Sequence, residues 1–280
     1  WHTSHVYFPG AATRPCADID VLVRPGEFQR AGAALQAAGF TETRRTGRPP
    51  RSEWAPPGRP LTLRSLELDH AENPWWIDLH QSLDRWYFRG LRAGFEPPLW
   101  KTVPVETGVG HVHGLAQPLL TVFLAMHAAF GVRDVRLLHL IELVFVIRRD
   151  TASSSLTWRD LKELLTATGT ARFAYPALEL AARLAPGPVD PDTRRPLAGT
   201  GTARMRRVVD AIAGAGMQLP RRTLDERLMW ACGARELLCN IGELVWPSDE
   251  ALPAADVARL YLRRARMLVR GQNGLRSQAR

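Results

Sequence analysis

The run from Asp18 to Val23 places two carboxylates inside a stretch that is otherwise typical of a β-strand. β-Branched residues alternate with Asp18 and Asp20 at its start, which is a strand pattern. Residues i and i+2 of a strand point to the same face, so the two carboxylates are expected to lie side by side. Like charges about 4 Å apart repel by about 1 kcal/mol even in bulk water. A divalent cation offsets this repulsion, and Mg²⁺ is held by one or two carboxylates together with substrate phosphates. The run therefore predicts a metal site.

A third carboxylate lies in a second strand-like run, Trp75 to His80. Asp78 is flanked there by apolar residues, and His80 is expected on the same face of the strand. If the two strands are neighbours, Asp78 completes a cluster of three carboxylates. Such a cluster holds two metal ions, which clamp the attacking and leaving oxygens of a displacement at phosphorus. Asp69, nearer to a turn, is the alternative third carboxylate.

Residues 1–115 are expected to form a small sheet with one early helix. Prolines and glycines are frequent in residues 46–60, which indicates an irregular loop. Residues 61–69 and 75–82 flank a turn and are expected to pair as a hairpin. The other elements predicted here are a helix over 27–38, a strand over 40–45 and a hairpin over 101–115.

Residues 116–280 have the pattern of helices separated by joints that are rich in glycine and proline. The chain is therefore expected to be α+β, with a small mixed β-sheet domain over 1–115 and a helical domain over 116–280. Apolar residues at helical spacing predict helices over 117–130, 135–149, 157–167, 171–184, 201–213, 223–245 and 254–270.

The Asp-x-Asp strand, the helix ending in Ala-Gly-Phe and the later Asp-Leu-His strand resemble the nucleotidyltransferase superfamily of the DNA polymerase β type. More closely, they resemble its bacterial branch of uncharacterised nucleotidyltransferases. The first strand of that branch reads Arg-x-x-x-Asp-Ile-Asp-Leu-Leu-Val, and Arg14 with residues 18–23 matches it. The later strand reads Val-Asp-Leu-His-Trp, which residues 77–80 match and Gln81 does not.

The same branch carries a helix with a histidine and then a helix that reads Arg-Leu-x-x-Leu-x-Asp. His127 fits the first helix, and Arg136 and Glu142 fit the second, with Glu in place of Asp. The resemblance covers residues 10–150 and implies a nucleotidyltransferase-like domain in which Asp18, Asp20 and Asp78 hold Mg²⁺ or Mn²⁺. The residues that it implies for nucleotide binding are Arg14, His80, His127, Arg136 and Glu142.

Some of these residues also have a structural interpretation. Arg14 either binds phosphate or pairs with an acid. His80 is a hydrogen-bonding partner of a metal ligand, a nucleobase contact or a hydrogen-bonded structural histidine. On an apolar helix, a hydrogen-bonded core histidine is the default for His127. The tryptophans are expected to pack between the two halves of the chain rather than to stack on bases; they are Trp75, Trp76, Trp86 and Trp100.

A glycine turn precedes the Asp-x-Asp strand in the superfamily, and in this branch it is closer to Lys-Gly on a helix. Its backbone N–H groups approach the triphosphate. Residues 1–17 contain no equivalent, and Gly10-Ala11 is the nearest pair. The spacing of the branch would place the motif just before Trp1, so a truncated N-terminus is expected. Otherwise the sequence favours an inactive member that binds a nucleotide or a partner protein.

Charge and composition give the expectations for partners and compartment. The net charge is +9, and residues 116–280 carry +8 of it, which favours an anionic acceptor such as RNA or an acidic protein. Of the 37 basic residues 35 are arginines, a bias typical of a GC-rich genome and weak evidence for a nucleic-acid partner. Three cysteines without a paired framework favour a cytoplasmic protein. No apolar run reaches about 18 residues, so no membrane helix is expected.

These features together predict a Mg²⁺-dependent transferase. It moves a nucleoside monophosphate from an NTP to an acceptor that is RNA, a protein, a peptide or a small molecule. Two alternatives remain: a catalytically inactive nucleotidyltransferase-fold protein that binds a nucleotide or a partner, and a nucleic-acid-binding scaffold that uses the basic residues 116–280.

Overall fold

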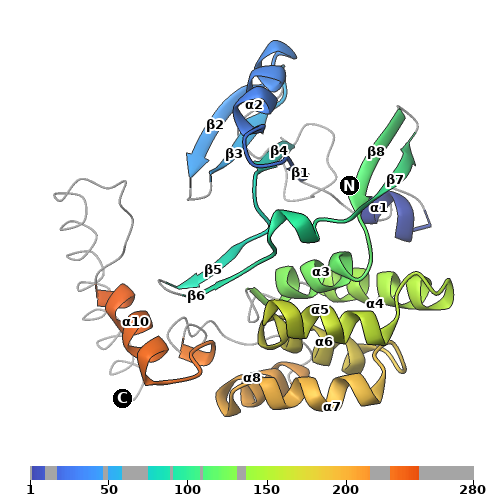
Figure 1. Ribbon diagram of the computed structural model, residues 1–280, viewed down its shortest axis with the longest axis vertical. Coiled ribbons are helices and arrows are strands. Elements are labelled where there is room, and N and C mark those ends of the chain that lie inside the picture. Colours follow the sequence, from blue (N-terminus) through green and yellow to red (C-terminus); the bar gives the residue numbers. More distant parts are fainter. Residues whose placement is uncertain are drawn as a thin grey trace, which may run out of the picture.

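The fold is α+β, as expected, with small sheets in the N-terminal part and helices after them (Figure 1). Among the described residues, no helix combines the length and apolar character that crossing a membrane requires. The computed structural model describes residues 2–9, 18–46, 50–58, 75–88, 91–107, 110–130, 137–214 and 228–245.

The two carboxylate strands belong to one mixed sheet of four strands. Its order is β1 (Asp18–Leu22), β4 (Trp76–His80), β3 (Arg51–Ala55) and β2 (Thr41–Thr46). β1 and β4 pair in parallel, whereas β3 pairs antiparallel with both β4 and β2. The expectation that the two carboxylate strands are neighbours is therefore confirmed. The expected hairpin partner over residues 61–69 lies outside the described residues.

β3 shows that the expectation of an irregular loop over residues 46–60 was wrong. The prolines lie on either side of a five-residue strand rather than within it. Trp54 of this strand is 4% exposed, and its indole N–H donates to Ser52 Oγ at 2.7 Å. Burial of an indole and backbone pairing on both sides of β3 outweigh the turn-like composition around it.

Helix α2 (Phe28–Ala37) covers one face of the sheet (Figure 1) and packs against Trp54 and Leu79 in a small core. Side chains alternate between the two faces of a strand. Because Leu79 points to α2, its neighbours Asp78 and His80 point to the opposite face. The helix thus determines which face of the sheet carries the carboxylates.

Two hairpins follow the sheet in sequence. β7 (Thr102–Thr107) and β8 (Gly110–Leu115) form the hairpin expected over residues 101–115. β5 (Arg85–Phe88) and β6 (Leu91–Ala93) form a shorter hairpin that the sequence did not predict. Its strands of four and three residues are too short to show a clear alternation.

The helices pack around α6, which contacts α3, α4, α5, α7 and α8. The larger core joins them to the hairpin β5/β6, so it contains side chains from both sides of residue 115. The division into domains 1–115 and 116–280 stays a prediction. The expected helices are α3 (Leu119–Phe130), α4 (Leu137–Ala152), α5 (Trp158–Thr168), α6 (Ala171–Leu184) and α8 (Ala203–Gly214). The single helix expected over 223–245 was wrong in its extent, because residues 231–233 are not helical and α10 (Ala234–Val245) begins after them. Two others were not expected, α1 (His2–Tyr7) and α7 (Pro191–Thr200), and residues 254–270 lie outside the described part.

Candidate metal centre

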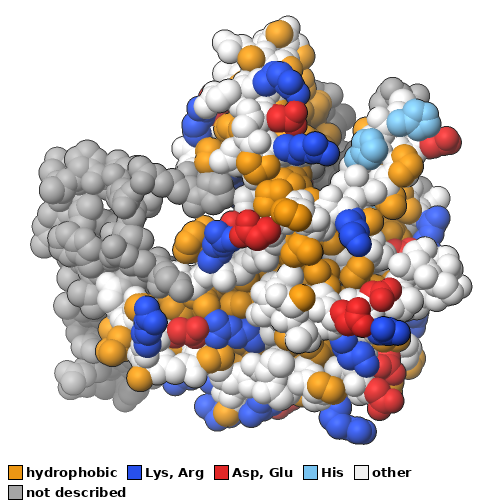
Figure 2. Space-filling model, in the orientation of Figure 1, with side chains coloured by type: hydrophobic (Ala, Val, Ile, Leu, Met, Phe, Trp, Pro, Cys, Tyr) orange, Lys and Arg blue, Asp and Glu red, His pale blue; other side chains and the backbone are white. Residues whose placement is uncertain are grey.

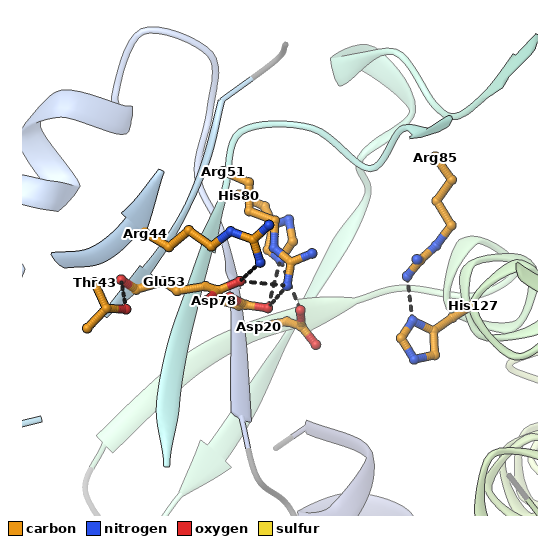
Figure 3. A network of polar contacts seen from close by, with 9 residues as sticks. All are labelled: Asp20, Thr43, Arg44, Arg51, Glu53, Asp78, His80, Arg85 and His127. Carbon is orange, nitrogen blue, oxygen red and sulfur yellow. Dashed lines mark hydrogen bonds and ion pairs between the residues drawn. The ribbon is translucent and has the colours of Figure 1, made fainter. Parts of the chain in front are cut away.

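Asp20, Asp78 and His80 meet on the face of the sheet that points away from α2 (Figure 3). Asp20 and Asp78 are direct partners in the parallel register of β1 and β4. One ligand atom from each of the three residues lies within 4.8 Å of the others. His80 Nε2 is 3.0 Å from Asp20 Oδ1 and 3.9 Å from Asp78 Oδ2. This spacing brings the three side chains within reach of one metal ion.

Asp78 supplies the test of whether a metal ion fits. The residue is 3% exposed. Arg51 of β3 donates to Asp78 Oδ2, whereas Oδ1 has no hydrogen-bond partner among the described residues. A buried polar atom without a partner costs about 1–3 kcal/mol, and a bound cation removes that cost. Because carboxylate oxygens are ligands that Mg²⁺ and Mn²⁺ prefer, these residues fit such an ion.

Asp20 is the more exposed carboxylate, with 59% of its side chain accessible. Burial acts to raise its pKa, but the hydrogen bond to His80 and electrostatic interactions with His80, His127 and Arg85 lower the pKa to about 2. The carboxylate is therefore ionised near neutral pH. A metal ligand must be in this state, because a proton and a metal compete for the same oxygen.

Asp18 lies on the same face of β1 as Asp20, two residues earlier. Burial and the negative charges of Asp20 and Asp78 raise the pKa of Asp18. The three carboxylates therefore share one electrostatic environment, as like charges in one site do. Among the described residues, the group whose ligand atoms converge includes His80 rather than Asp18. A metal-binding role for Asp18 stays a prediction.

Arginines from β2 and β3 lie beside the carboxylates (Figure 3). Glu53 Oε1 is 4.0 Å from Arg51 Nη2 and 3.8 Å from Arg44 Nη1. The side chains of Arg51 and Arg44 are 46% and 65% exposed. The sheet thus presents two accessible guanidinium groups next to its acidic cluster.

Arg85 of β5 and His127 of α3 contact each other on the helical side of the site (Figure 3). Both interact electrostatically with Asp20, and Figure 3 shows the pair to one side of that carboxylate. The sequence had indicated His127 but not Arg85. The only signal for Arg85 was the β-prone run Arg-Trp-Tyr-Phe that follows the Asp78 strand.

The other expected site residues are less well connected to the cluster. Glu142 of α4 is 2% exposed and lies about one helical turn from His139. The ring of His139 is 4.9 Å from that of His127, so the two helices α3 and α4 meet at this point. A nucleotide-binding role for Glu142 stays a prediction. The remaining expected residues, Arg14, Arg136 and Asp69, lie outside the described residues.

A comparison with profiles of known families gives a match that spans residues 2–186, and the matching family is described as "Uncharacterised nucleotidyltransferase". The match includes the carboxylate sheet, both hairpins and the helices from α3 to α6. Neither the curated proteins nor the solved structures gave a match. Because the matched segment is well over half of the 280 residues, the protein belongs to the uncharacterised nucleotidyltransferase family.

Proposed function

We propose that the protein is a metal-dependent nucleotidyltransferase that moves a nucleoside monophosphate from an NTP to a hydroxyl group of an acceptor. The observation that carries the proposal is the register of β1 and β4, which sets Asp20 directly beside Asp78 with His80 within reach of both. Membership of the family supports nucleotidyl transfer in general. The acceptor, as proposed, is RNA, a protein, a peptide or a small molecule.

In the proposed mechanism the acids of the cluster bind metal ions, and His80 orients one of these acids. Asp20 and Asp78 hold a Mg²⁺ or Mn²⁺ ion, and Asp18 adds a carboxylate for a second ion. When bound, such ions stabilise negative charge on the α-phosphate and lower the pKa of the attacking hydroxyl. His80 hydrogen-bonds to Asp20 and so orients its carboxylate, as partners of metal ligands commonly do.

The arginines on the sheet orient the triphosphate. Arg44 and Arg51 present accessible guanidinium groups, which bind phosphate oxygens through charged hydrogen bonds. The acceptor oxygen then forms a bond to the α-phosphorus while the bond to pyrophosphate breaks, and the acceptor proton passes to solvent. Placement of the triphosphate beside Arg51 aligns the leaving group with the attacking oxygen, which is the main contribution of a protein to this chemistry.

The preference for an anionic acceptor rests on net charge. Residues 116–280 carry +8. On the face shown in Figure 2, basic and acidic side chains of the described helices are interspersed rather than gathered into one basic patch. The charge of the helical part therefore gives a general attraction for anions and does not by itself mark an RNA-binding surface.

Label transfer tests the proposed function. The protein is mixed with Mg²⁺, one α-³²P-labelled NTP at a time, and an extract that contains candidate acceptors. The wild type is expected to give a labelled product that Asp20→Asn abolishes. Asp160→Asn is the control, because Asp160 is an exposed acid on α5 outside the metal group. Label transfer by Asp20→Asn at the wild-type rate would overturn the proposal.

One observation favours the non-catalytic alternative: Arg51 forms an ion pair with Asp78, the carboxylate that is proposed as a metal ligand. A protein that only binds nucleotides would retain this ion pair and bind an NTP equally well with Mg²⁺ or with EDTA. Equilibrium dialysis of labelled NTP under both conditions separates the two functions, since the transferase requires tighter binding with the metal.

A further inference from the structure

Arg85 and Tyr87 of β5 both lie against Phe130 of α3, although the strand has an irregularity between Trp86 and Phe88; the ring centroid of Tyr87 is 5.4 Å from that of Phe130. Tyr87 packs among aromatic rings, with centroids 4.4 Å from Phe173 and 4.5 Å from Trp230. The guanidinium carbon of Arg85 lies 5.5 Å from the ring centroids of two phenylalanines of α3, Phe123 and Phe130. The strand thus presents a cation and a hydroxyl to an aromatic environment.

Asp20 is near enough to affect the pKa of Arg85, but no carboxylate of the described residues is in direct contact with its guanidinium group. The Nε–H of Arg85 has no hydrogen-bond partner among the described residues. Its side chain donates to Nδ1 of His127, which is a neutral acceptor rather than a counterion. Burial lowers the pKa of Arg85, which reflects the cost of keeping a cation away from water. A buried charge is normally paired, and the described residues supply no such partner in contact with Arg85.

Tyr87 adds a second donor without an acceptor. Its hydroxyl is buried and has no hydrogen-bond partner among the described residues. Burial raises the pKa of Tyr87, so the hydroxyl keeps its proton and can donate it. Tyr87 and the guanidinium group of Arg85 both contact the ring of Phe130, so the two groups are neighbours. One anionic group bound between Arg85 and Tyr87 would accept hydrogen bonds from both and balance the positive charge of Arg85.

Arg85 lies beside the candidate metal centre. The charge of Arg85 acts on Asp20, and Figure 3 shows Arg85 and His127 on the opposite side of Asp20 from Arg51. Arg85 keeps part of its surface exposed, so a ligand can reach it. An anion held there would lie beside the reacting groups, on the helical side of the site.

We propose that Arg85 and Tyr87 form a subsite for an oxyanion, a phosphate or carboxylate group of a substrate, with His127 as a positioning residue for Arg85. The inference rests on the proposed function, because it assigns to the same site a substrate with an anionic group on its helical side. Guanidinium groups bind both kinds of oxyanion through paired hydrogen bonds. The group belongs either to the NTP or to the acceptor.

Binding of inorganic phosphate without metal tests the subsite directly. Isothermal titration in EDTA at constant ionic strength is expected to show phosphate binding to the wild type. Arg85→Gln is expected to weaken it by roughly tenfold or more, and Tyr87→Phe by a smaller factor, as the loss of charged and neutral hydrogen bonds predicts. Arg92→Gln is the matched control, since Arg92 lies on the paired strand β6 and is balanced by Asp84 and Glu96.

Two further measurements separate the possible results. Arg85→Gln is expected to melt at the same temperature as the wild type or higher, because it removes an unpaired buried charge, whereas a purely structural arginine would lower the melting temperature. Asp20→Asn is expected to keep phosphate binding and lose nucleotidyl transfer, so failure of the proposed function and failure of the subsite give different results. Equal phosphate affinity in wild type and Arg85→Gln would overturn the proposal.

The source of the oxyanion follows from kinetics of Arg85→Lys, which keeps the charge and loses the planar geometry. If the oxyanion belongs to the NTP, this variant raises the Kd for Mg²⁺-NTP. If it belongs to the acceptor, the Kd for Mg²⁺-NTP is unchanged and the KM for the acceptor rises. Either result supports the subsite, and a variant with both constants unchanged contradicts it.

Discussion

At the scale of single residues, Asp78 is the most constrained acid of the site. It is buried, one of its oxygens accepts from Arg51, and the other has no partner among the described residues. A neutral amide at this position would keep the shape and lose the charge. Asp78→Asn is therefore expected to weaken Mn²⁺ binding by at least about tenfold, since one charged ligand contributes at least about 1.4 kcal/mol. The affinity is measured from the electron paramagnetic resonance signal of the free Mn²⁺ that remains in solution.

The control for Asp78→Asn is Asp160→Asn, which removes an equal charge from the exposed surface of α5. It is expected to bind Mn²⁺ like the wild type. A loss of affinity equal to that of Asp78→Asn would show that overall charge, rather than the cluster, attracts the ion. The same conclusion would follow if added salt weakened binding to both proteins equally, because salt screens exposed charges more than buried ones.

The sequence indicated the acids of the site better than their partners. Asp18 and Asp20 could be predicted because period-2 alternation is local, and it places both on one face without knowledge of the fold. Arg51 could not, because its contact with Asp78 depends on the register between strands that lie 27 residues apart. Arg85 was also missed, since its environment is made by aromatic residues of α3.

At the scale of elements, β3 determines whether the carboxylates are held in place. Its Trp54 packs against α2 on one face of the sheet, while Arg51 reaches Asp78 on the other. Trp54→Ala is expected to lower the free energy of unfolding by about 3–5 kcal/mol, through lost burial and the cavity left behind. Chemical denaturation measures this. Trp86 is 48% exposed, so Trp86→Ala is expected to change the free energy of unfolding by less than about 1 kcal/mol.

The same strand explains why the element boundaries could only partly be predicted. Long amphipathic helices such as α5 and α6 were located from their apolar spacing, because that signal accumulates over several turns. β3, β5 and β6 have three to five residues each, and tertiary pairing rather than local pattern stabilises them. Helix α7 contains Pro191 and Pro196, which made it resemble a joint.

A buried glutamate joins three of the helices. Glu179 of α6 is 5% exposed and accepts hydrogen bonds from Arg194 of α7 at 2.6 Å and from Arg183 at 2.7 Å. Arg183 also donates to Asp210 of α8 at 2.6 Å. Burial acts to raise the pKa of Glu179, but the hydrogen bonds from Arg194 and Arg183 outweigh it and lower the pKa.

Glu179→Gln is expected to lower the free energy of unfolding by about 2 kcal/mol at pH 7, because it breaks a buried ion pair. A depressed pKa gives stability that is complete above the ordinary glutamate value and is lost as the pH falls through the folded-state value. The deficit of the variant should therefore shrink below about pH 4.3. Urea denaturation from pH 7 to pH 3 measures the free energy of unfolding of the variant and of the wild type. The control is Glu163→Gln, because Glu163 forms an exposed ion pair with Arg159. A deficit that stays constant over this range would contradict the assignment.

At the scale of the whole molecule, the site draws on two parts of the chain. The carboxylates belong to the four-stranded sheet, whereas Arg85 and His127 belong to the hairpin β5/β6 and to α3. Leu22 of β1 packs against the larger core, which joins the polar face of the sheet to the helices. In the proposed function Mg²⁺ binds to the sheet alone, whereas a substrate with an oxyanion at the proposed Arg85 subsite contacts both parts.

Thermal unfolding distinguishes these two modes of binding. A ligand present at 100 times its Kd stabilises the native state by about 2.7 kcal/mol, which is a rise of about 5 °C for a protein of this size. Mn²⁺ is expected to give such a rise in the wild type and in Arg85→Gln, and none in Asp20→Asn. Phosphate in EDTA is expected to stabilise the wild type and Asp20→Asn, but not Arg85→Gln. Because each variant loses one ligand and keeps the other, loss of both responses in either variant would show that the two groups form one indivisible site.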